Sequence, residues 1–209
     1  MKNWLTHNFR ASGSLIVTGA VFAIIVVGTI AAARQPDEAP AERQPQLIIG
    51  DTVGADFEEL AQETWTTFIA VFRARSGCFG DVRLEAARNL NSRAAYDPGS
   101  AIVTVRVPAT AAMLKSALIH EWAHHIEFQC AAHQDLRPAF LAAQGLPPDT
   151  PWRLDNSPTD APEIAWSNIP SEQYAEAAIE LALGRRQIPG KIHLTKEAVQ
   201  ALEMWAYGE

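Results

Sequence analysis

Two histidines and a glutamate lie close together in the middle of the chain. His120, Glu121 and His124 form the pattern His-Glu-x-x-His. On a helix, side chains four residues apart lie on one face, so both rings can reach one zinc ion at about 2.0–2.1 Å. Glu121 follows about 100° around the helix, where its carboxylate can accept a proton from water on the metal without being a ligand. The pattern predicts a hydrolytic Zn²⁺ site with Glu121 as general base.

The residues around this motif predict that it lies on a buried helix. Residues 111–132 contain no Gly or Pro, and Thr110 before them is a suitable N-cap. Apolar side chains occupy the remaining surface of the motif: Leu118, Ile119, Trp122, Ala123 and Ile126. The alternative interpretation is that the two histidines and the glutamate lie on the solvated face of an ordinary core helix.

The segment from His120 to His124 resembles the zinc-binding helix of the zincin superfamily of metallopeptidases. Metzincins are disfavoured, because His133 is the only histidine in residues 128–136 and stands at an unsuitable distance. Residues 171–177, Ser-Glu-Gln-Tyr-Ala-Glu-Ala, resemble instead the glutamate-bearing helix of gluzincins. The resemblance implies Glu172 as the third zinc ligand and Glu176 as a support for a ligating histidine.

Several other polar residues remain open to interpretation. Glu176 is the main alternative to Glu172 as the third ligand, followed by Glu180 and Glu163. An oxyanion-stabilising donor is also needed, but spacing alone places none of its candidates, which are Tyr96, Tyr174, Tyr207 and His125. We expect solvated or surface positions, without a catalytic role, for Glu127, His133 and His193.

The remaining patterns predict an α+β fold, with a small mixed or antiparallel sheet packed on the motif helix and on further helices. Strands are expected over 81–86 and 101–107, and the turn signal Asp97-Pro98-Gly99-Ser100 between them favours a hairpin. Apolar spacing and caps predict helices over 56–75, 171–184 and 195–207. The proline-rich stretch 145–170 is expected to be irregular.

The N-terminal part predicts a membrane anchor. Residues 14–33 are uncharged and long enough to cross a bilayer as a helix. Lys2 and Arg10 precede them, which favours a cytoplasmic N-terminus at 1–13. A cleaved signal peptide is the alternative, since Ala31 to Ala33 satisfy the small-residue rule. Residues 34–46 then form a Pro-rich tether, and 47–209 the zinc metallopeptidase-like domain.

Charge and cysteine content characterise the exported part. Positions 1–33 hold two of the 17 basic residues and none of the 24 acidic ones, so the remainder carries a net charge of −9. This acidity argues against nucleic-acid partners. Cys78 and Cys130 are the two cysteines, and an oxidising exterior would allow them to form a disulfide.

The sequence as a whole predicts a membrane-anchored, extracytoplasmic zinc peptidase that acts on a peptide or protein substrate. One of the two expected strands would bind the substrate by strand addition. The alternative is a non-catalytic exported binding module whose metal is structural or absent. Two histidines and one glutamate leave a coordination position open, which favours catalysis. Oligomeric state is not predicted.

Overall fold

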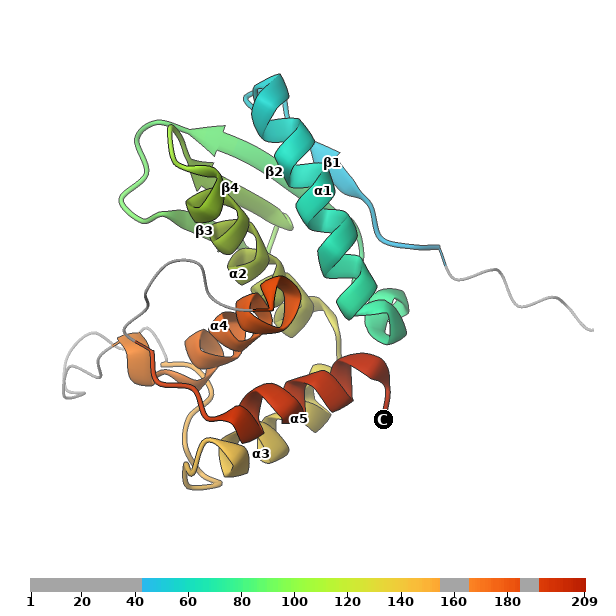
Figure 1. Ribbon diagram of the computed structural model, residues 1–209, viewed down its shortest axis with the longest axis vertical. Helices are drawn as coiled ribbons and strands as arrows, with labels where there is room; N and C mark the ends of the chain where they lie inside the picture. The colour runs from blue at the N-terminus through green and yellow to red at the C-terminus, as the bar shows by residue number, and fades with distance from the viewer. Residues whose placement is uncertain (1–42, 155–165, 185–191) are drawn as a thin grey trace, which may run out of the picture. The chain divides into compact units, whose positions relative to one another are not determined.

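A computed structural model describes residues 43–154, 166–184 and 192–209, all within one unit, Ala41–Glu209 (Figure 1). The anchor predicted at 14–33 and the candidate ligand Glu163 lie outside the described residues. Among the described helices, none has both the length and the apolar character needed to cross a membrane.

A four-stranded mixed sheet forms one layer of the domain. Its strands are β1 (Leu47–Ile49), β2 (Val82–Ala87), β3 (Ala94–Asp97) and β4 (Ile102–Arg106). The spatial order is β1-β2-β4-β3, in which β2 runs parallel to both β1 and β4, while β3 is antiparallel to β4. The sheet therefore has β1 and β3 at its edges.

The two predicted strands exist, but they do not form a hairpin with each other. They correspond to β2 and β4, which are parallel neighbours, so the hairpin interpretation was wrong. The predicted turn joins β3 to β4 instead, and the Asp97 side chain accepts hydrogen bonds from Gly99 N at 3.0 Å and Ser100 Oγ at 2.5 Å. The sequence Ala-Ala-Tyr-Asp of β3 contains no β-branched residue, which explains why it was missed.

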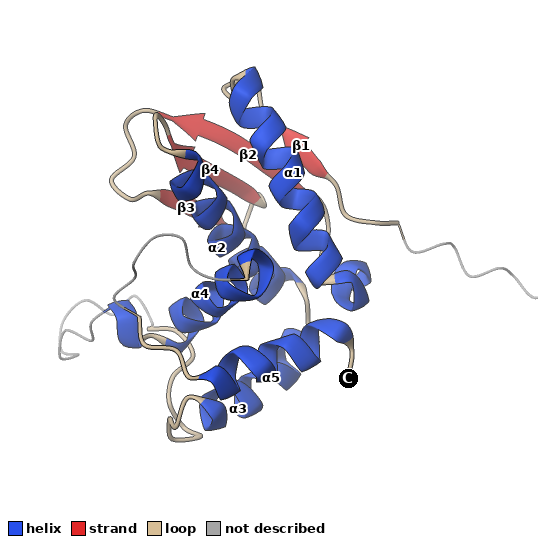
Figure 2. Cartoon of the chain, in the orientation of Figure 1, coloured by secondary structure: helices blue, strands red, loops and turns tan. Residues whose placement is uncertain are grey.

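Helices α1 (Ala55–Val71) and α2 (Ala111–Gln129) cover one face of the sheet (Figure 2). The α1 helix connects the parallel strands β1 and β2, as a βαβ crossover requires. It ends at Val71, short of the predicted 75, and a 3₁₀ helix, η1 (Arg73–Cys78), follows.

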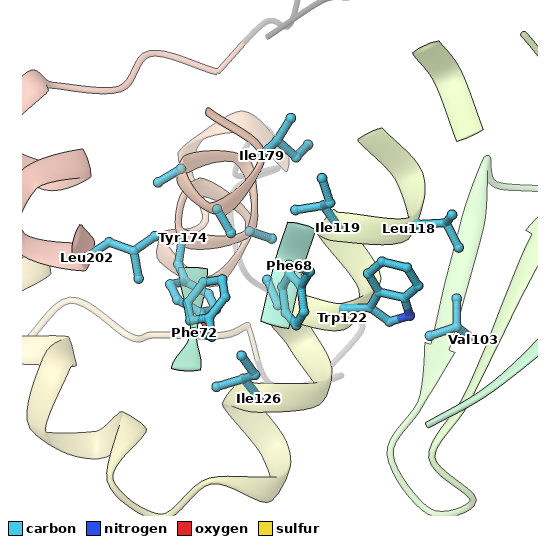
Figure 3. Close-up of a cluster of buried hydrophobic side chains, with 14 of the residues drawn as sticks. Phe68, Phe72, Val103, Leu118, Ile119, Trp122, Ile126, Tyr174, Ile179 and Leu202 are labelled. Atoms are coloured by element: carbon cyan, nitrogen blue, oxygen red, sulfur yellow. The ribbon is translucent and has the colours of Figure 1, made fainter. Parts of the chain in front are cut away.

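The motif helix α2 is anchored at its start and along its apolar side. Thr110 caps the helix, its side chain accepting from Met113 N at 3.4 Å. Trp122 is fully buried on the side of α2 that faces Val103 of the sheet (Figure 3). Its ring also packs edge-on against Trp65 of α1, with 4.9 Å between ring centroids. These contacts fix the rotation of α2 about its own axis.

Three further helices complete the domain: α3 (His133–Ala143), α4 (Pro170–Leu183) and α5 (Lys196–Tyr207), with a short 3₁₀ helix η2 (Trp166–Asn168) before α4. The predicted helices at 171–184 and 195–207 are confirmed to within a residue or two. The α4 helix starts with Pro170 in its first turn and ends at Gly184, which adopts φ 71°. The α3 helix was not predicted; it contains Pro138.

The predicted disulfide between Cys78 and Cys130 is present. It joins the end of η1 to the C-cap residue of α2, six residues beyond His124. Because it closes 52 residues of sequence, loop entropy gives a stabilisation of about 4 kcal/mol. Such a bond is typical of proteins outside the reducing cytoplasm.

His133 lies in the aromatic core, so the expectation of a surface histidine was wrong. Its side chain is fully buried, and its ring contacts Tyr174, Trp152 and Trp205 at centroid distances of 4.5, 5.4 and 5.7 Å. Burial lowers the pKa of His133 to about 3, because the charged imidazolium would lose its hydration there. The ring is therefore neutral in the folded protein at ordinary pH.

This buried ring makes stability depend on pH. Below about pH 6.5 the unfolded chain protonates His133 while the folded chain does not until about pH 3, so stability is lost as pH falls through that window. We predict that His133→Phe reduces this loss by up to about 1.4 kcal/mol per pH unit. Denaturant unfolding of both proteins at several pH values between 6.5 and 4 measures it, and identical slopes would contradict the assignment.

Candidate metal centre

The side chains of His120, His124 and Glu172 converge on one point between α2 and α4. His120 Nε2 lies 3.2 Å from His124 Nε2 and 3.0 Å from Glu172 Oε2, and His124 Nε2 lies 3.6 Å from the same oxygen. A tetrahedral ion with bonds of 2.0–2.1 Å holds its ligand atoms about 3.3 Å apart. The three atoms thus have the spacing of three corners of a zinc coordination shell, and together they could hold a metal ion.

Helix geometry explains how the three side chains meet. The two histidines lie one turn apart on α2, and Glu172 lies in the first turn of α4, which packs against α2. Figure 3 shows Ile119 of α2 and Ile179 of α4 in the contact between these helices, both fully or almost fully buried. A carboxylate in the first turn of a helix is also favoured by the helix dipole.

A carboxylate lies behind each of the two histidines. Glu176 Oε1 is 3.3 Å from His120 Nδ1, and Glu127 Oε2 is 2.9 Å from His124 Nδ1. Each ring therefore turns Nε2 toward the cluster and Nδ1 toward a glutamate. Since Glu176 contacts the far nitrogen of His120, the geometry favours Glu172 as ligand and Glu176 as its supporting residue.

The charges of these groups depend on their mutual contacts. Burial alone would raise the pKa of Glu172, but hydrogen bonds with His120 and His124 hold this pKa well below its usual range. Burial would likewise lower the pKa of His124, but hydrogen bonds with Glu127 and Glu172 raise it overall. Glu172 is therefore an ionised carboxylate, the form that binds a metal ion.

Glu121 lies beside the cluster and is almost completely buried. Burial raises the pKa of its carboxyl group, while the neighbouring His120 and His124 and a hydrogen bond from the backbone of Tyr96 oppose that rise. A raised pKa makes the carboxylate a better proton acceptor near neutral pH. The position and environment of Glu121 are those expected of a general base.

An open cavity of about 710 Å³ gives access to the cluster. One side is formed by residues 92–96, which include most of the edge strand β3, and the other sides by α2 and α4. Three further side chains line the cavity: Phe128, Arg153 and Trp166. The sequence had not indicated a role for any of them. The ring of Trp166 stacks on His120 with 5.9 Å between centroids. A cavity of this size can accommodate several residues of a peptide.

The candidates for oxyanion stabilisation differ in whether they line the cavity. Tyr96 lines the cavity, with its hydroxyl 2.9 Å from His125 Nδ1. His125 is held from its other side by the Gly80 carbonyl, 2.9 Å from Nε2. Tyr174 is fully buried and Tyr207 is half exposed on α5, and neither lines the cavity. Tyr96 is therefore the candidate that lines the cavity, but its hydroxyl hydrogen is donated to His125 Nδ1, because Nε2 carries the ring proton that the Gly80 carbonyl accepts.

The remaining acidic and basic candidates differ in their exposure to solvent. Glu180 is exposed on α4, and His193 is exposed, as expected. Glu127 is buried, so the expectation of a solvated side chain was wrong. Its spacing of three residues from His124 on the same helix is the sequence signal that could have identified it.

Comparison of the chain with models of known protein families, with curated proteins and with solved structures found no match. The function of the chain is therefore inferred from the geometry of the site.

We predict that the full chain binds about one Zn²⁺, because the cluster supplies a three-ligand set. His124→Ala should lose this zinc, whereas His193→Ala, which removes an exposed histidine, should retain it. Metal analysis after dialysis measures both. Glu172→Gln should weaken binding more than Glu176→Gln; the reverse order would make Glu176 the ligand.

Proposed function

We propose that this chain is a zinc-dependent peptidase. The observation that carries the proposal is the position of Glu121, whose carboxylate shares an open cavity with the three converging atoms of His120, His124 and Glu172. A structural zinc site would be closed by a fourth protein ligand, usually Cys or His. Both cysteines of this chain are consumed in the disulfide.

The donor set suits zinc, since imidazole nitrogens and carboxylate oxygens are its usual ligands. When bound, zinc would supply Lewis acidity, lowering the pKa of water beside it and polarising a substrate carbonyl. Glu121 would accept the proton of the attacking water and pass it to the leaving amine. Its raised pKa fits both steps, because the same group must take up a proton and release it.

The edge strand β3 supports a peptide substrate. Residues 94–96 line the cavity, and β3 pairs with β4 on one side while forming the edge of the sheet on the other. An extended peptide could add to this edge through main-chain hydrogen bonds. The two strands expected to do this from sequence, β2 and β4, are interior to the sheet, so that expectation was wrong.

The proposed setting is the outer face of a membrane, with residues 14–33 as the anchor and the catalytic domain exported. The disulfide between Cys78 and Cys130 supports an oxidising compartment. The uncharged length of 14–33 and the basic residues before it support the orientation. Cleavage after the small residues near 33 would give a secreted enzyme instead.

We predict that Glu121→Gln keeps zinc but loses peptide hydrolysis. The amide has the shape of the carboxylate but cannot accept the proton, and general-base catalysis contributes about 10²–10⁴-fold. The full chain in mild detergent would be assayed on a peptide library, with zinc measured in the same samples. Glu203→Gln, which removes an exposed carboxylate of α5, is the matched control.

Two outcomes would contradict the proposal. Full activity of Glu121→Gln would remove this residue from the mechanism. A wild-type chain that carries zinc but cleaves nothing in the library would favour the binding-module interpretation.

A further inference from the structure

We infer that Glu127, held by Arg153 and Trp152, is a positioning residue that orients His124 for metal binding. The inference rests on the proposed metal site and deepens it, because it assigns the second histidine a support separate from Glu176. Residues 152–154 follow the proline-rich stretch after α3, yet they return to the end of α2.

The Glu127 carboxylate is completely surrounded by partners. Its side chain is 1% exposed. Trp152 Nε1 donates to Oε1 at 2.7 Å, and the Arg153 guanidinium donates to both oxygens, from Nε at 2.5 Å and from Nη2. His124 Nδ1 lies 2.9 Å from Oε2. Both oxygens of Glu127 therefore accept hydrogen bonds from the Arg153 guanidinium, which can only donate.

The proton on the His124 ring can be assigned from these contacts. Nδ1 of His124 has two neighbours, Glu127 and Arg153, whose Nη2 lies 3.2 Å away. A guanidinium can only donate, so Arg153 cannot accept a hydrogen from Nδ1. Glu127 Oε2 is closer, and it is an acceptor because it also accepts from the Arg153 guanidinium. The Nδ1 hydrogen therefore points to Glu127. When the ring is neutral, as a metal-binding histidine must be, the lone pair is therefore on Nε2, which faces His120 and Glu172.

The contacts of Glu127 are better explained by a role in orienting His124 than by a contribution to folding stability. An ion pair of a buried carboxylate adds little to net stability, because the cost of removing the carboxylate from water offsets the attraction. A carboxylate that accepts from the outer nitrogen of a ligating histidine fixes the ring and raises its basicity, and such contacts are worth about 10–100-fold in metal affinity. Glu127 has the position for this role.

The support itself is rigid. The Trp152 ring packs edge-on against Phe140 and His133, with centroid distances of 5.7 and 5.4 Å. The Arg153 guanidinium lies over the Phe128 ring at 3.8 Å. Both partners of Glu127 are thereby fixed by contacts that do not involve the ligand cluster. His124 is oriented by residues from α2 and 152–153, whereas His120 is supported by Glu176 of α4.

The test compares zinc affinity by chelator competition in the full chain. Glu127→Gln should raise the zinc dissociation constant about 10–100-fold. Glu180→Gln removes an exposed carboxylate of α4 and should leave the dissociation constant unchanged. The visible absorption of Co²⁺ in place of zinc should change in Glu127→Gln and remain as in wild type in the control. An unchanged affinity in Glu127→Gln would overturn the inference.

A double variant separates positioning from folding, since Glu127→Gln alone leaves Arg153 without its charge partner. Glu127→Gln combined with Arg153→Met removes both charges and should recover thermal stability while zinc affinity remains weak. Wild-type affinity in the double variant would show that Glu127 serves only to neutralise Arg153, and would overturn the inference. These readouts do not use hydrolysis, so an inactive but zinc-binding wild type would refute the peptidase proposal alone.

Discussion

The contact between α2 and α4 is the constraint on which the site depends. Helix periodicity alone brings His120 and His124 together, but the third side chain of the cluster, Glu172, must come from another element at a fixed distance. On α4, Glu172 and Glu176 lie one turn apart on the same face, and both contact His120 of α2. The aromatic packing of Trp122 on the opposite side of α2 prevents the helix from rotating away from this contact.

Charge within the site is arranged in alternating layers. Glu172 lies in front of the two imidazoles, and Glu176 and Glu127 lie behind them. Arg153 then balances Glu127 from the outside. Buried carboxylates are costly unless they are hydrogen-bonded, and each of these contacts a histidine. The same packing buries Glu121, so one set of contacts both orders the candidate metal ligands and raises the pKa of the Glu121 carboxyl group.

Local patterns in the sequence predicted part of this arrangement. His120, Glu121 and His124 follow from helix periodicity, and Glu172 and Glu176 from the resemblance to gluzincins. The α+β class and the disulfide were also predictable. Strand β3, helix α3 and the burial of His133 were not, because they depend on tertiary contacts that short or proline-containing segments do not encode locally. The partners of Glu127 come from residues 152–153, so sequence spacing could suggest its side of α2 but not its role.

The most direct test of the proposed metal site is the position of zinc in crystals of the zinc-loaded chain, determined by anomalous diffraction at the zinc absorption edge. We expect one strong peak at about 2.0–2.2 Å from His120 Nε2, His124 Nε2 and a Glu172 oxygen, with the fourth position facing the cavity. A peak elsewhere in the chain, or a fourth protein ligand that closes the coordination shell, would contradict it.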